Sequence, residues 1–242
     1  MKMLRPLVPA PRMQPYGDAC VGTEVDPMDL YLWSGRVARA AFEDISHVEV
    51  ALRSAIAQKL SERYGIEWYS RRDILDYPTL RLIEKAISAG RLKDLDVALE
   101  VKHGKLVATL MFGFWVKVLG KGTSLDGERR IYDTTIWKEA VRQAFPNVGD
   151  LDRSVVERAV RDLKELRNRI AHHEHIIWGV PIAGQEVAGK PRRDSLLAAH
   201  NNLIRVAGFL DIDFAEWLSS KSEVSHLITA CPVSDRTRFF FE

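Results

Sequence analysis

The sequence predicts an all-α protein, a helical bundle that carries an irregular N-terminal arm. Apolar residues recur every three or four positions through residues 29–64 and again through residues 154–170, as on the buried side of amphipathic helices. The longest apolar run, residues 106–119, does not alternate with polar residues, which favours a buried helix over a strand. No segment of 20 to 50 residues repeats along the chain.

Residues 1–28 form the predicted arm. Because proline lacks a backbone N–H and disrupts the interior of a helix, this part is expected to lie extended on the surface without regular helix. Residues 29–242 are expected to form a single helical domain, since 242 residues can enclose one core. The prolines of the arm are Pro6, Pro9, Pro11, Pro15 and Pro27.

The first long helix is predicted over residues 29–64, with a bend near residues 44–47 and an end at Gly65. Glu49 and Arg53 lie four residues apart beside its apolar stripe. They could form a surface ion pair worth a few tenths of a kcal/mol, or they could line a cleft. The stripe consists of Leu30, Trp33, Val37, Ala41, Val48, Leu52, Ile56 and Leu60.

Shorter helices are expected along the rest of the chain. Phe112, Phe114 and Trp115 are interpreted as core residues rather than as a platform on which bases stack. The Gly-rich, charged loop at residues 120–130 lacks the spacing of a phosphate-binding loop. The expected helices cover residues 78–89, 94–101, 104–120, 133–145, 195–211 and 214–220, residues 179–193 are expected to be a loop, and residues 239–241 to pack a tail onto the body.

The central helix is predicted to begin with a capping box formed by Ser154 and Glu157. Its last turns hold an unusual polar cluster. Asn168 and His172, four residues apart, share a ridge away from the apolar stripe, and Arg167 lies near the edge of that stripe. The stripe is Val156, Ala159, Val160, Leu163, Leu166 and Ile170, and the cluster is Arg167, Asn168, Arg169, His172, His173, Glu174 and His175.

Four interpretations of this cluster remain open from the residues alone. It could be a solvated helix end, where basic side chains interact with the last carbonyl groups. It could be a metal site, although the spacing is not that of a HExxH motif and nothing else in the sequence completes a ligand set. It could bind phosphate without catalysis, or it could cleave a phosphodiester.

Cleavage of RNA would suit these side chains chemically. An RNA strand supplies its own nucleophile, the 2′-hydroxyl, so the protein must only move protons and stabilise charge on the phosphate. His172 suits proton transfer because its ordinary pKa lies near neutrality. Arg167 would hold the phosphoryl oxygens, and Asn168 would orient His172 or the phosphate. Acid and base could come from two copies across a two-fold dimer.

Composition limits the partners. Lys and Arg total 35 and Asp and Glu total 33, so an anionic partner must be held by a local patch rather than by bulk charge. Cys20 and Cys231 lie far apart in the sequence without metal spacing, which we interpret as a reduced, cytoplasmic protein. No run is long enough for a membrane span, and no cofactor motif is present, so we expect no membrane association, no cofactor and no metal.

The cluster also resembles a known family. The string from Arg167 to His172 fits the Arg-x4–6-His motif of HEPN domains, and LRNRIAHHE resembles the Abi-like (abortive infection, AbiD/AbiF-type) branch. Three further segments resemble that branch in the expected order: LYLW, FEDISHVEVALRSAI and GKLVATLMFGFWVKVL. The sequence departs from it at Ser34 and Ser54, where the branch has Asn, and at His175, where it has Pro.

The resemblance implies a HEPN-type helical bundle that pairs across a symmetric homodimer. It implies metal-independent RNA cleavage by Arg167 and His172 with Asn168 in support, in a toxin or phage-defence effector. Arg169, His173, Glu49 and Arg53 are the expected substrate-binding residues, and an antitoxin partner is left open. Some HEPN domains only bind RNA or nucleotides, so a non-catalytic binding or regulatory module is the alternative.

Overall fold

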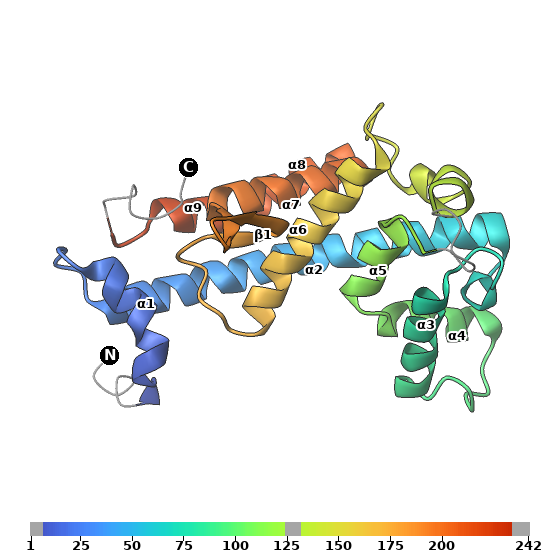
Figure 1. Cartoon of the computed structure of the whole chain (residues 1–242), viewed down its shortest axis with the longest axis horizontal. Coiled ribbons are helices and arrows are strands. Elements are labelled where there is room, and N and C mark those ends of the chain that lie inside the picture. Colours follow the sequence, from blue (N-terminus) through green and yellow to red (C-terminus); the bar gives the residue numbers. More distant parts are fainter. Residues whose placement is uncertain (1–6, 124–131, 234–242) are drawn as a thin grey trace.

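The computed structural model describes residues 7–123 and 132–233, and over these residues the protein is predominantly helical, which confirms the all-α prediction. The helices are α1 (Ala10–Cys20), α2 (Pro27–Tyr64), α3 (Tyr77–Ala89), α4 (Leu99–Thr109), α5 (Phe112–Leu119), α6 (Arg153–Ala171), α7 (Leu196–Leu210), α8 (Ile212–Lys221) and α9 (Val224–Thr229). Helix α2 crosses the whole molecule (Figure 1). Helix α1 lies at its N-terminal end, and α3, α4 and α5 group towards its C-terminal end.

Helix α2 forms the spine because one side of it is apolar over its full length. All eight residues of its predicted stripe are buried, and the chain runs through residues 44–47 without a break in the helix. Asp26 caps the first turn by accepting the N–H of Met28, with Pro27 in the first helical turn. Gly65, at a φ of 86°, ends the helix as predicted.

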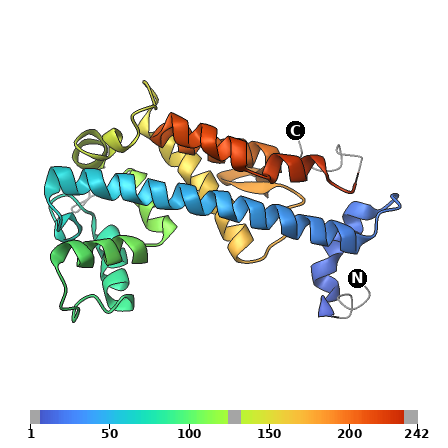
Figure 2. The same ribbon diagram turned by 180° about the vertical axis from the view of Figure 1, so that it is seen from behind.

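Helices α6, α7 and α9 pack against α2, and α8 packs on α7. Seen from behind, α2 runs in front and α6 crosses it obliquely (Figure 2). The C-terminal end of α6 therefore emerges between α1 and the group of α3 to α5, as both views show. The apolar stripe predicted for this helix is buried at every position, which fixes the side that α6 turns outward.

The N-terminal arm contradicts the prediction in its conformation. Residues 10–20 form α1, although they were expected to be extended. Pro11 lies in the first turn, where its missing N–H costs nothing, and Pro15 removes one hydrogen bond inside the helix. Burial of Tyr16, Ala19 and Cys20 against the body compensates for that loss. The division into an arm of residues 1–28 and a domain of residues 29–242 stays a prediction.

Three further helix predictions need correction. Residues 104–120 do not form one helix, because α4 ends and α5 begins around Leu110 and Met111, whose backbones are extended. The break lets Leu110 and Phe112 both enter the core, and Phe114 and Trp115 are buried there as predicted. The short helix expected at residues 94–101 begins only at Leu99. Residues 133–145 form a π-helical turn, η3 (Asp133–Lys138), and a 3-10 turn, η4 (Val141–Ala144).

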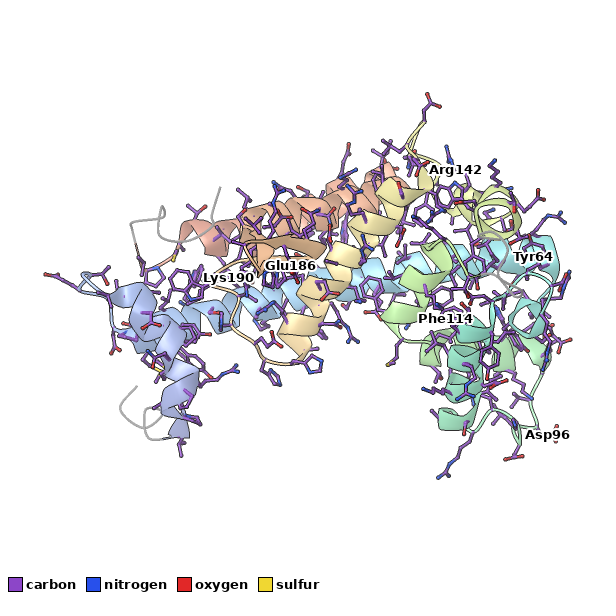
Figure 3. The ribbon with its side chains drawn as sticks, in the orientation of Figure 1. Tyr64, Asp96, Phe114, Arg142, Glu186 and Lys190 are labelled. Carbon is purple, nitrogen blue, oxygen red and sulfur yellow. The ribbon has the colours of Figure 1, made fainter. Side chains whose placement is uncertain are left out.

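Residues 180–194, within the expected loop, form an antiparallel hairpin of β1 (Val180–Val187) and β2 (Lys190–Asp194). Its turn places Ala188 and Gly189 at positive φ, the conformation that suits a two-residue hairpin turn. Strand β1 packs on α6, where Ala183 donates its N–H to Asp162. Glu186 and Lys190 lie on the side of α6 that faces α1 (Figure 3).

The remaining predictions on the fold have mixed outcomes. The helices expected at residues 195–211 and 214–220 correspond to α7 and α8. The tail expected at residues 239–241 lies outside the described residues. No helix within residues 7–123 or 132–233 combines the length and the hydrophobicity that crossing a bilayer requires.

Candidate functional site

Helix α6 is fixed firmly at its N-terminal end. Asp152, rather than the predicted Ser154, is the N-cap, and its carboxylate accepts the N–H of Ser154 at 2.7 Å. Arg153 is buried in the first turn, where it donates to Asp133 and to the carbonyl of Leu119, and to Glu157 at 3.3 Å. Glu157 therefore serves as an ion-pair partner and not as half of a capping box.

The C-terminal end of α6 closes in a Schellman motif. The N–H of His173 donates to the carbonyl of Ile170 at 2.9 Å, and that of Glu174 donates to the carbonyl of Arg169 at 2.8 Å. His173 has a φ of 56°, in the left-handed region that usually holds glycine at this position. The helix therefore stops immediately after the predicted motif, and the two hydrogen bonds hold the strained backbone of His173 in place.

Arg167 faces α2 and meets Glu49 there. The Nε of Arg167 lies 3.7 Å from Oε2 of Glu49, and the two side chains keep 33% and 17% of their surface exposed. This is an ion pair at the long limit, and Nε itself is buried without a hydrogen bond to any described residue. The structure thus brings together Glu49 and Arg167, 118 positions apart in the sequence. That Glu49 lines a substrate cleft stays a prediction.

His172 is the C-cap residue of α6, and its side chain is exposed. Its backbone N–H donates to the carbonyl of Asn168 at 2.9 Å, which sets the two residues on consecutive turns. Among the residues that the structure describes, neither the imidazole of His172 nor the side-chain amide of Asn168 makes a hydrogen bond. Both polar groups are therefore available to a ligand.

Arg169 is already occupied by its own loop. Its guanidinium lies 3.0 Å from the carboxylate of Glu174 and donates to the carbonyl of His175 at 3.3 Å. Burial, together with the nearby Arg169 and Arg193, lowers the pKa of His175. These contacts stabilise the loop after α6. The geometry therefore favours a role for Arg169 in holding this loop over direct contact with a substrate.

Arg53 and His173 are the remaining residues predicted to bind substrate. Arg53 is half-buried on α2 and, within the described residues, does not make the predicted ion pair with Glu49, whose carboxylate pairs with Arg167 instead. His173 is exposed and lines a groove formed with α1 and α2. Over residues 7–123 and 132–233, no three His, Cys, Asp or Glu side chains are grouped to hold a metal ion.

That groove has a volume of about 750 Å³ and was not predicted from the sequence. Its walls include Arg12 of α1, Tyr31 and Arg36 of α2, and Ala171 and His173 at the end of α6. Because residues 10–20 were expected to be irregular, nothing in the sequence pattern indicated that Arg12 would lie near the motif. The spacing of Tyr31, Gly35, Ala38 and Phe42 along one side of α2 was the signal that could have indicated a groove floor.

A second histidine cluster has a different character. His200, Ser222 and Asp44 lie together, with hydrogen bonds of 3.0 Å from His200 to Ser222 and 2.6 Å from Ser222 to Asp44. His200 and Asp44 are each 6% exposed, which leaves a substrate little of either side chain to contact. The hydroxyl of Ser222 donates its hydrogen bond to the carboxylate of Asp44 and not to the imidazole of His200. This network joins α2, α7 and the start of α9, and its role is structural.

Comparison with known proteins agrees with the resemblance that the motif carries. A family model described as Abi-like protein matches residues 23–178, which include α2, α6 and the complete motif. A search of curated proteins and a search of solved structures each returned no match.

Proposed function

This chain belongs to the Abi-like protein family, and from that premise we propose that it is a metal-independent endoribonuclease of the HEPN type. The family description also motivates the proposal that it acts as an abortive-infection or phage-defence effector in the cytoplasm. His172 is the proton-transfer residue, Arg167 stabilises the phosphoryl group, and Asn168 positions one or both.

One observation carries this proposal. At the end of α6, the imidazole of His172 and the amide of Asn168 are left without hydrogen-bond partners among the described residues, and a partly exposed Arg167 directly precedes Asn168 in the chain. Glu49 holds Arg167 loosely enough that a phosphate can compete for its guanidinium, because an ion pair at 3.7 Å and partial exposure is weak. In contrast, Arg153 at the other end of α6 makes three hydrogen bonds within the protein.

The proposed reaction balances without an external nucleophile. A base removes the proton of the 2′-hydroxyl, and the 2′-oxygen forms a bond to phosphorus. The bond from phosphorus to the 5′-oxygen breaks, and an acid gives a proton to that leaving oxygen. The products are a 2′,3′-cyclic phosphate and a 5′-hydroxyl. Arg167 offsets the negative charge that accumulates on the phosphoryl oxygens.

The reaction needs two proton-transfer groups, and the ridge of one protomer offers a single suitable histidine, His172. We therefore include a homodimer in the proposal, in which the ends of two α6 helices face each other and each contributes one His172. The side chain of His172 is exposed at this helix end, which lies between α1 and the group of α3 to α5 (Figure 1), and this supports such an approach.

The test uses wild-type protein, labelled single-stranded RNA and an excess of EDTA. We expect cutting in EDTA, products that end in a 2′,3′-cyclic phosphate, and no cutting at a position where a 2′-deoxynucleotide replaces the ribonucleotide. Cutting of the deoxy-substituted position, or products with a 5′-phosphate, would contradict the proposal. Activity that EDTA abolishes would redirect it to a metal-dependent reaction.

A second candidate, a non-catalytic RNA-binding or regulatory module, is favoured by the ion pair itself. Glu49 compensates part of the charge of Arg167, and a carboxylate beside the phosphate site would oppose charge build-up in a transition state. Salt-dependent RNA binding with no product after long incubation would identify this function.

A further inference from the structure

The groove between α1, α2 and the end of α6 touches the motif directly. Ala171 and His173, the two neighbours of His172 in the chain, both line it. Consecutive Cα atoms are about 3.8 Å apart, so the wall of the groove begins within one residue of the proposed catalytic imidazole. Its volume of about 750 Å³ lies in the range of pockets that bind small ligands.

The lining of this groove is largely apolar, and its charged residues are mainly arginines. Arg12 and Arg36 line it, and neither forms an ion pair with a carboxylate of the described residues. The acidic residue of the wall, Glu174, is already paired with Arg169 at 3.0 Å. Arg39, also in the wall, is paired with Glu223. Two uncompensated guanidinium groups therefore remain for an anionic occupant.

Aromatic rings border the same space. Tyr31 is half-buried, and Phe42, eleven positions further along α2, is 44% exposed. Eleven residues are close to three helical turns, so both rings lie on one side of α2. Tyr16 of α1 packs edge-on against Tyr31 with ring centroids 5.3 Å apart, and the Tyr16 ring is buried. These contacts hold α1 in place as the second wall.

A glycine keeps the floor of the groove open. Gly35 lies inside α2 between the two rings, where glycine costs a helix roughly 0.5–1 kcal/mol relative to alanine. A Cβ built on Gly35 would meet no atom within 4 Å, so no close packing explains the missing side chain. The space above it is therefore available to a ligand.

We propose that this groove binds the nucleotide that flanks the scissile phosphate of a single-stranded RNA, with its base against Tyr31 and Phe42 and its phosphates on Arg12 and Arg36. This inference rests on the proposed function and names the substrate contacts of the same site. Aromatic rings beside a basic groove are the features by which proteins bind single strands. A second copy placed here by a two-fold axis would bring these arginines close to their own counterparts, which like-charge repulsion disfavours.

The experiment measures the affinity of His172→Ala protein, in which cutting is blocked, for a fluorescein-labelled single-stranded RNA of about twelve nucleotides by anisotropy. Adding Arg36→Glu should raise the Kd roughly ten-fold and reduce the dependence of log Kd on log salt, because one phosphate contact is lost. Adding Gly35→Leu should raise the Kd at least about five-fold by filling the groove, without lowering Tm, because leucine favours helix over glycine.

Matched controls carry the same changes elsewhere. Arg72→Glu alters an exposed arginine near α3, and Gly104→Leu fills open space on α4, where a Cβ would also meet no atom within 4 Å. Both should leave the Kd within about two-fold of the His172→Ala protein. Groove variants that bind RNA like these controls overturn the inference, and so does a His172→Ala protein that does not bind RNA.

A change in oligomeric state on light scattering, caused by Gly35→Leu or Arg36→Glu, would also overturn the inference, because it would assign the groove to a second copy. Failure of the proposed function looks different. In that case the RNA still binds and the groove variants still weaken binding, but the wild-type protein yields no product.

Discussion

The two ends of helix α6 carry arginines in opposite surroundings. Arg153, in the first turn, has 6% of its side chain exposed and donates to Asp133, Glu157 and the carbonyl of Leu119. Arg167, in the last turns, keeps 33% of its side chain exposed and has one carboxylate, that of Glu49, at 3.7 Å. The same residue type is thus bound into the fold at one end and left open at the other.

The difference separates side chains that stabilise the helix from side chains that can act on a ligand. A buried arginine must have its donors satisfied, because an unpaired buried charge is costly. The exposed nitrogens of an arginine near the surface can lack protein partners at little cost, since water satisfies them until a ligand arrives. The end of α6 that carries His172 and Asn168 also has this open character.

The largest expected effect on stability lies at the closed end. Arg153→Met should reduce the free energy of unfolding by about 3 kcal/mol, because it leaves Asp133 and Glu157 without their cation and the carbonyl of Leu119 without its donor. Urea titration followed by circular dichroism measures this loss. A loss below about 1 kcal/mol would remove the distinction between the two ends.

At the open end, the expected effect is on the reaction. Arg167→Lys keeps the charge but loses the planar fork, and we expect RNA cleavage to slow about 100-fold, equivalent to about 2.7 kcal/mol in the barrier. Single-turnover kinetics measure the change. Arg161→Lys, on the same helix and paired with Glu157 at 3.6 Å, is the matched control and should cleave RNA at the wild-type rate.

A smaller effect should follow from the strained stop of the helix. His173→Gly removes the side chain from a left-handed backbone, so the free energy of unfolding should rise by about 1 kcal/mol and Tm by about 2–4 °C. Differential scanning calorimetry measures this gain. If Tm falls instead, the His173 side chain must contribute contacts that outweigh its backbone strain.

The smallest expected effect is on the pH dependence of stability, to which a residue at each end of α6 contributes in a different pH range. Burial and neighbouring arginines lower the pKa of His175, so below its unfolded pKa of about 6.5 the unfolded chain binds more protons, and stability falls as the pH decreases through that value. The hydrogen bond from Ser154 lowers the pKa of Asp152, whose contribution is present above about pH 4 and lost below it. Urea midpoints across pH 3.5–7.5 test both windows. His175→Gln should reduce the slope in the upper window only in part, because burial also lowers the pKa of His103, and should leave the lower window unchanged. An unchanged slope in the upper window would refute the assignment to His175.

Residues with regular apolar spacing were predictable, and they include the frame of the site. The stripes of α2 and α6 are buried at each predicted position because a 3.6-residue period admits one buried side. The spacing also predicted Asn168 and His172 on a ridge away from the buried stripe of α6 and Arg167 near the edge of that stripe. Their availability to a ligand follows from that spacing.

Other parts depended on contacts that no local pattern encodes. Pro15 opposes helix, yet α1 is helical because Tyr16, Ala19 and Cys20 are buried on the body of the protein. Asp152 outcompetes Ser154 as N-cap by geometry that spacing alone does not decide. The pairing of Glu49 with Arg167 depends on how α2 and α6 cross, so the sequence could name the two residues without joining them.

The most direct test of the difference between the two ends is a paired measurement on His172→Ala, with His226→Ala as an exposed histidine control on α9. Because the imidazole of His172 is exposed, its removal should leave Tm within about 1 °C of wild type. We predict that the same protein cleaves RNA at least 100-fold more slowly in EDTA, while His226→Ala cleaves it normally. Equal cleavage by His172→Ala and wild type would contradict the account.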